Sequence, residues 1–140
     1  ANESEIQAAA SKSMIHKEIS ELPKGYQTRI GERGVSLSGG QKQRTSIARA
    51  LIKNLKILIL DDALSAVDAN TEQEISNTLN KELAGKTLFN ITHRLNPNNH
   101  YDKILVLHRG EIVARGDHET LYYSNKFYRH LIDHAALESM

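Results

Sequence analysis

The sequence predicts an α/β fold in which strands and helices alternate, and three observations carry this prediction. Ile57 to Leu60 form a continuous apolar run that ends in two aspartates, which is typical of a parallel strand buried on both faces. Helical patterns of apolar residues precede this run over Gln41 to Lys53 and follow it over Thr71 to Leu83. A second apolar segment, Thr87 to Thr92, predicts another buried strand, so the two types of element alternate along the chain.

The N-terminal part is predicted to be helical. Ser4 precedes an Ala-rich stretch and suits the capping position of a helix, and apolar residues at helical spacing continue as far as Leu22. Pro23 and Gly25 then break the pattern. The stretch from Thr28 to Gly34 contains two glycines and is predicted to be a loop.

The C-terminal part is predicted to contain a hairpin and a closing helix. Two strand-like segments, Lys103 to Leu107 and Glu111 to Arg115, flank the turn residues Arg109 and Gly110. Lys126 to Leu137 have the pattern of a helix.

Composition narrows the class of protein. The chain has 140 residues with 39% hydrophobic side chains, enough for one domain with a modest core. Its 18 basic and 17 acidic residues give a net charge of +1, so we expect no nucleic-acid partner. The absence of cysteine excludes disulfides and Cys-based zinc sites. No apolar run reaches the roughly 20 residues that span a bilayer, and the chain, which lacks an initiator Met and a signal peptide, reads as a fragment.

The most informative segment for chemistry is Leu37–Gln41. It combines a hydroxyl at Ser38, bare backbone at Gly39 and Gly40, and the start of a predicted helix. The backbone N–H groups and the positive end of the helix dipole together favour a bound phosphate. The same residues also fit an ordinary Ser-capped helix after a glycine turn.

Carboxylates follow the first predicted strand. A carboxylate at the C-terminal end of a parallel strand lies where open α/β sheets bind ligands. Asp61 could hold Mg²⁺ through water, and Asp62 could orient or deprotonate an attacking water. The alternative is a turn in which aspartate serves as a cap.

A histidine follows the second predicted strand. If the two strands are neighbours and parallel, His93 lies at the same sheet edge as Asp61 and could contact a γ-phosphate or a water. A single histidine at a strand end is also often structural.

Four segments in this order resemble the ATP-binding cassette (ABC) family. Leu37–Gln41 is similar to its signature motif, Asp61–Asp62 to the end of its Walker B motif, Ser65–Asp68 to its D-loop and Ile91–Arg94 to its H-loop. The resemblance covers essentially the whole chain.

Further stretches resemble cassettes of the exporter type. Thr28–Gly34 is similar to the X-loop of exporters, and there the residue matched by Glu32 faces the coupling helices of the membrane domains. Gly25–Thr28 and Ala114–His118 are similar to exporter cassettes as well. Without the resemblance, Glu32 would be read as a solvated loop charge.

The resemblance implies a fold, a function and a set of site residues. The fold is the C-terminal portion of a RecA-like P-loop NTPase cassette, with residues 1–55 in the helical subdomain and 56–140 in the core. ATP and Mg²⁺ would bind between two cassettes at the cytoplasmic face of the cell membrane, and hydrolysis would be coupled to export through transmembrane domains. The resemblance implies that the γ-phosphate in the partner-held site is contacted by Ser38, Gly39, Gly40 and Gln41. In the chain's own site, Asp61 would hold Mg²⁺, Asp62 would orient the attacking water and His93 would contact the γ-phosphate. Asp68 would contact the second cassette, and Glu32 would couple the cassette to the membrane domains.

Two departures from the family pattern affect the expected activity. Walker A and the Q-loop are not found in this sequence, because Gly85-Lys86-Thr87 follows Asn80 instead of the required glycine and leads into a strand. The chain alone is therefore expected to be inactive. Asp62 stands where the family usually has glutamate, which resembles the weak-site subunit of heterodimeric exporters.

Two alternative functions remain at this level. A non-transport ABC-type ATPase, for example in chromosome maintenance, would share the signature and Walker B pattern, but such proteins add long coiled coils and no sustained heptad repeat appears here. The other alternative is a non-catalytic truncated fragment. The transported substrate is not encoded in these residues.

Overall fold

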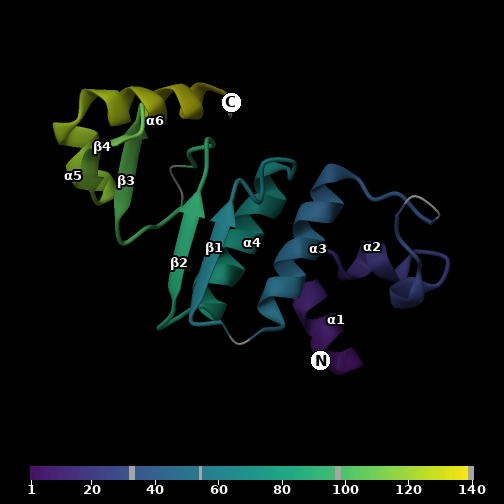
Figure 1. Ribbon diagram of the computed structural model, residues 1–140. Coiled ribbons are helices and arrows are strands. Elements are labelled where there is room, and N and C mark those ends of the chain that lie inside the picture. The colour runs from purple at the N-terminus through teal and green to yellow at the C-terminus, as the bar shows by residue number, and fades with distance from the viewer. Residues whose placement is uncertain (32–33, 54, 97–98, 139–140) are drawn as a thin grey trace. The chain divides into compact units, whose positions relative to one another are not determined.

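The computed structural model describes residues 1–140 except 32–33, 54, 97–98 and 139–140. The chain forms two compact units, Ala1–Thr92 and His93–Met140, and each is described by itself. Figure 1 shows the first unit as a pair of parallel strands with helices packed on it, and the second as a hairpin with two helices.

The first helix, α1 (Glu3–Lys12), has its N-cap two residues before the expected position. Asn2, and not Ser4, is the capping residue, because its side chain accepts a hydrogen bond from the backbone N–H of Glu5 at 2.9 Å. The Glu5 carboxylate accepts the N–H of Asn2 in return, at 2.7 Å. This reciprocal pair satisfies two donors that a helix start otherwise leaves unpaired, and a cap at Ser4 would lose it.

The helical pattern is interrupted after α1. Met14 has a positive φ of 59°, and a short helix α2 (His16–Ser20) starts just after it. A single 3₁₀ turn, η1 (Gly25–Gln27), follows Pro23. The break at Met14 divides the predicted N-terminal helix into two pieces, α1 and α2.

The alternation of helices and strands is confirmed in the first unit. Its main elements are α3 (Gly39–Leu51), β1 (Ile57–Asp61), α4 (Ala69–Glu82) and β2 (Thr87–Ile91). The two strands pair in parallel, with their last residues, Asp61 and Ile91, opposite each other. Their carboxyl ends therefore meet at one edge of the sheet, as the sequence predicts.

The core of this unit lies on one face of the strand pair. Helices α3 and α4 cover this face, where Leu58 and Leu60 pack with Ile47, Ile75 and Leu79. On the other face, the Ile57 and Ile59 side chains are 56% and 62% exposed.

The prediction that both strands are buried on both faces is therefore wrong for this chain. Phe89 and Ile91 of β2 are more than half exposed as well. An apolar run shows that a strand can be buried on two faces, but the neighbouring elements decide whether both faces are covered.

The second unit contains the predicted hairpin. Strands β3 (Ile104–His108) and β4 (Glu111–Gly116) pair in antiparallel fashion. The two turn residues, Arg109 and Gly110, have φ values of 51° and 82°, and a tight two-residue turn with both φ values positive matches the twist of a hairpin.

Two helices follow the hairpin. The predicted closing helix is present as α6 (Lys126–Glu138), but α5 (His118–Ser124) was not predicted. Its sequence signal is Asp117, which accepts the backbone N–H of Thr120 at 2.7 Å as an N-cap. The core of this unit is formed by Val106, Leu121, Tyr128 and Ile132. Within the described ranges, no helix is long and apolar enough to cross a bilayer.

Ile75→Ala should destabilise the first unit strongly. Ile75 is completely buried between α4 and β1, and the truncation leaves a cavity that costs about 2–5 kcal/mol of unfolding free energy. Ile59→Ala, on the exposed face, should change it by about 0.5 kcal/mol or less. Urea denaturation of the two variants measures the difference, and equal losses would contradict this location of the core.

Candidate functional site

The segment Leu37–Gln41 forms the capped start of α3. The Ser38 hydroxyl accepts the backbone N–H of Gln41 at 3.2 Å, and the Gln41 side-chain oxygen accepts the N–H of Ser38 at 2.9 Å. Among the residues that the structure describes, no acceptor meets the N–H groups of Gly39 and Gly40. The helix start therefore presents two open backbone donors where its dipole is positive, an arrangement suited to phosphate oxygens.

The glycines also have a packing role that sequence reasoning did not find. A Cβ atom added to Gly40 would lie 2.8 Å from the carbonyl oxygen of Ala66, and one added to Gly39 would lie 3.3 Å from the Ala66 Cβ. The first distance is a clash with backbone, which cannot be relieved by rotating a side chain. Glycine at position 40 thus lets α3 approach the loop between β1 and α4.

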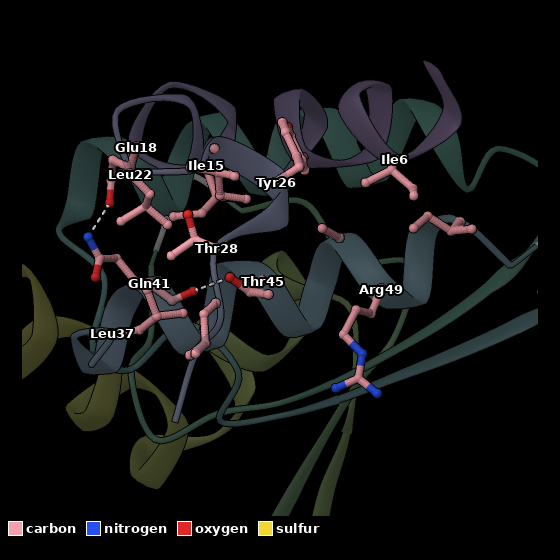
Figure 2. A pocket seen from close by; sticks show the side chains of 16 residues that line it. Ile6, Ile15, Glu18, Leu22, Tyr26, Thr28, Leu37, Gln41, Thr45 and Arg49 are labelled. Atoms are coloured by element: carbon pink, nitrogen blue, oxygen red, sulfur yellow. Dashed lines mark hydrogen bonds between the residues drawn. The ribbon is translucent and has the colours of Figure 1, made fainter. Parts of the chain in front are cut away.

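A carboxylate from α2 also holds the start of this helix. Figure 2 shows Glu18 pointing at Gln41, whose amide donates to it at 2.7 Å. Arg44, one turn further along α3, forms an ion pair with the same carboxylate at 2.7 Å and donates to the carbonyl oxygen of Met14. Burial raises the pKa of Glu18, but the hydrogen bonds from Arg44 and Gln41 and the charge of Arg44 outweigh it, so the pKa lies below its ordinary value of 4.5.

The two aspartates after β1 lie in different surroundings. Asp61 is exposed and shares the uncovered face of the strand with Ile59. Asp62 has a left-handed backbone with φ of 49°, and its N–H donates to the carbonyl oxygen of Ile91 at 2.8 Å. Aspartate tolerates this conformation better than most residues, which gives position 62 a structural reason to be aspartate.

A second residue of α3 that sequence reasoning missed, Gln43, reaches this loop. Its amide nitrogen lies 3.2 Å from the carbonyl oxygen of Asp62 and 2.9 Å from the hydroxyl of Ser65, and its oxygen accepts the N–H of Ala66 at 2.9 Å. These partners lie 19 to 23 residues further along the chain, so no local pattern identifies the contact.

The structure brings some of the predicted site residues together. Ser38, Gly39, Gly40 and Gln41 lie at one helix start, which packs on the loop that follows Asp61 and Asp62. Asp68, at the end of this loop, caps α4 by accepting the N–H of Thr71 at 3.0 Å. The backbone and side chain of Thr71 hold the pKa of Asp68 below its ordinary value by hydrogen bonding to the charged form. A dimer contact for Asp68 stays a prediction.

The roles of the other predicted residues stay predictions. His93 is exposed and is the first residue of the second unit, so its pairing with Asp61 stays a prediction. Glu32 lies outside the described residues. Within the described part of the chain, no three His, Asp or Glu side chains gather as ligands of a metal. The role of Asp61 as a ligand of Mg²⁺ through water stays a prediction.

A pocket of about 200 Å³ lies beside the start of α3 (Figure 2). It is bounded by α1, α2, η1 and α3, and its lining is mainly aliphatic, with Glu18 and Gln41 at one end. Such a lining offers burial for hydrocarbon and not the backbone donors that a phosphate requires. The candidate anion site is accordingly the helix start and not this pocket.

Glu18→Gln should remove a contribution to stability that depends on pH. Because folding lowers the pKa of Glu18, the native carboxylate stabilises the fold above its unfolded pKa of 4.5, and this stability is lost as the pH falls through the lower pKa of the folded state. The melting temperature of the native chain should exceed that of the variant at neutral pH, and the difference should shrink below pH 4.5.

Circular dichroism melts over this pH range measure the effect. Glu21→Gln is the matched control, since it replaces an exposed carboxylate of the same region. A difference for Glu18→Gln that stays constant with pH would contradict a stabilising charge at this position.

Comparison with known proteins shows similarity to ABC transporters. A model of the ABC transporter family matches residues 2–65. The chain is 49% identical over 140 residues to the multidrug resistance-like ATP-binding protein MdlA of Buchnera aphidicola subsp. Schizaphis graminum, covering 99% of this chain and 24% of that protein. It is 50% identical over 129 residues to the probable multidrug resistance ABC transporter ATP-binding/permease protein YheI of Bacillus subtilis, covering 92% and 22%.

The fold agrees as well. The structure of a bacterial Atm1-family ABC exporter with ATP bound superposes with a TM-score of 0.90 and 42% identity, over 97% of this chain and 24% of that one. The chain thus spans about a quarter of the length of these relatives. The predicted fold, a portion of a RecA-like ABC cassette, is confirmed. The chain thus matches part of an ATP-binding domain of ABC transporters of the exporter type.

Proposed function

We propose that this chain completes the ATP site of a second cassette through the start of α3. The observation that carries the proposal is the pair of N–H groups at Gly39 and Gly40, which find no acceptor among the described residues, next to the Ser38 hydroxyl. Family members use ATP and Mg²⁺, and the γ-phosphate is the part of ATP that a helix start can bind from the opposite side. Backbone donors at fixed positions stabilise charge without having to reorganise during the reaction.

Within its own cassette, the chain supplies the carboxylates at the end of β1. Asp61 would hold Mg²⁺ through water, and Asp62 would orient the attacking water, with His93 at the γ-phosphate. Aspartate is one methylene shorter than glutamate, so its carboxylate lies back by roughly 1.5 Å, the length of a C–C bond. A shift near 1 Å can reduce a rate on the order of 10²-fold. This subunit would therefore own the weaker site of a heterodimer while its signature segment serves the stronger one.

The whole protein is proposed to be a multidrug-type exporter. The relatives named above include an ATP-binding/permease protein, in which the cassette and the membrane part belong to one chain. The cassette would lie at the cytoplasmic face of the membrane, with Glu32 toward the coupling helices of the transmembrane domains. Asp68 would contact the second cassette. A purely non-catalytic role would leave turnover unchanged when the residues below are replaced.

Ser38→Arg in the full transporter should suppress hydrolysis at the ATP site held by the partner cassette. A large cation at the helix start would obstruct the approach of the γ-phosphate to the backbone N–H groups, and we expect a loss on the order of 10²-fold. Steady-state ATPase activity measures it. Ser46→Arg, at an exposed position further along the same helix, is the matched control and should retain activity. Equal activities of the two variants would remove the proposed role of Ser38.

Asp62→Glu should raise turnover at this subunit's own site, because glutamate extends the carboxylate toward the attacking water, which must lie within about 2.6–3.2 Å. The partner's catalytic carboxylate is first replaced by glutamine, so that only this site is measured. The left-handed backbone at position 62 is less favourable for glutamate, so the melting temperature is recorded as a control. Turnover that stays at background with both residues would show that the short carboxylate does not limit the site.

A further inference from the structure

The side-chain amide of Gln43 is used completely by the loop after β1. Its nitrogen donates to the carbonyl oxygen of Asp62 at 3.2 Å and to the hydroxyl of Ser65 at 2.9 Å, and its oxygen accepts the N–H of Ala66 at 2.9 Å. An amide has a donor end and an acceptor end, so this set of partners determines which way it points. A carboxylate or a hydrocarbon of similar size cannot make the same three contacts.

These contacts hold the backbone of Asp62 in an uncommon conformation. The residue has φ of 49°, a region that costs energy for side chains other than glycine and persists only when the surroundings enforce it. Its N–H is bound by the carbonyl oxygen of Ile91 at 2.8 Å, and its carbonyl oxygen is bound by Gln43 and by the hydroxyl of Ser65 at 3.0 Å. The direction in which the Asp62 carboxylate leaves the backbone therefore depends on Gln43.

Close packing joins the same two elements. The start of α3 contacts the loop at Gly40, where a Cβ atom would lie 2.8 Å from the carbonyl oxygen of Ala66. Ala66 is thus contacted by α3 twice, by the amide of Gln43 and by the backbone of Gly40. The helix that carries Gln43 is therefore packed directly against the loop that carries Asp62.

We propose that Gln43, on the helix that completes the partner-held ATP site, is a positioning residue that holds Asp62 for the attacking water at this subunit's own ATP site. The proposal rests on the proposed function of Asp62. The new element is the prediction that a residue outside the four identified motif segments selectively controls one of the two ATP sites. The signature segment keeps its own cap between Ser38 and Gln41, so the partner-held site does not need Gln43.

The test uses Gln43→Leu and Gln43→Glu in the full transporter. Gln43→Leu removes all three hydrogen bonds, whereas Gln43→Glu keeps the acceptor for the N–H of Ala66 and loses the donor to Asp62. For each variant, kcat and KM are measured at this subunit's own ATP site (the own site). In these measurements the partner's catalytic carboxylate is replaced by glutamine, and Asp62 is either native or replaced by glutamate. Each is also measured at the partner-held site, with Asp62→Asn. Ser46→Ala, at an exposed position on the same helix, is the matched control.

Both variants should lower kcat at the own site by about tenfold or more, with KM within about twofold, because a displaced carboxylate affects the chemical step and not ATP binding. The partner-held site and Ser46→Ala should stay within about twofold of their parents. Equal losses at both sites, together with a lower melting temperature, would overturn the proposal in favour of a general structural role.

Two further outcomes separate this proposal from the one on which it rests. Unchanged kcat at the own site, while Ser38→Arg still blocks the partner-held site, would overturn the role of Gln43 alone. An own site that stays at background with native Asp62 and with Asp62→Glu would overturn the role of Asp62 and that of Gln43 with it.

Discussion

The contact between the start of α3 and the carbonyl oxygen of Ala66 is the constraint on which the rest of the site depends. A Cβ atom at position 40 would come within 2.8 Å of this oxygen, so only glycine lets the helix lie against the loop. The same absence of side chains keeps the N–H groups of Gly39 and Gly40 accessible, and no acceptor among the described residues meets them. One requirement for bare backbone thus serves both packing and the proposed recognition of phosphate.

The helix start is held by two kinds of side chain, one charged and one neutral. The carboxylate of Glu18 accepts a hydrogen bond from Gln41 and forms an ion pair with Arg44, and both contacts stabilise its charge. The neutral amide of Gln43 binds backbone groups of the loop after β1. Because these contacts reach α2 and the loop after β1, the open donors are presented by a fixed element and not by a flexible turn, as electrostatic recognition requires.

The elements with strong local signals were predictable from the sequence. The Ser38 cap, the apolar run before Asp61 and the Arg109-Gly110 turn each depend on neighbours within a few residues, and the structure contains all three elements. Two features were not predicted correctly, the cap of α1 and the helix α5. Asn2 replaced Ser4 as a cap because it pairs with Glu5, and the short helix after Asp117 has too few turns to show a periodic pattern.

The sequence by itself determined the class of fold, the order of the motif segments and the types of residue available for phosphate and metal chemistry. Only the tertiary structure showed that Glu18 and Gln43 hold α3, that Asp62 has a left-handed backbone, and that one face of β1 is left uncovered by the described residues. The physical reason is distance along the chain. Local patterns follow from periodicity and capping, whereas contacts over about 20 residues depend on which elements pack together, and a linear pattern does not record that.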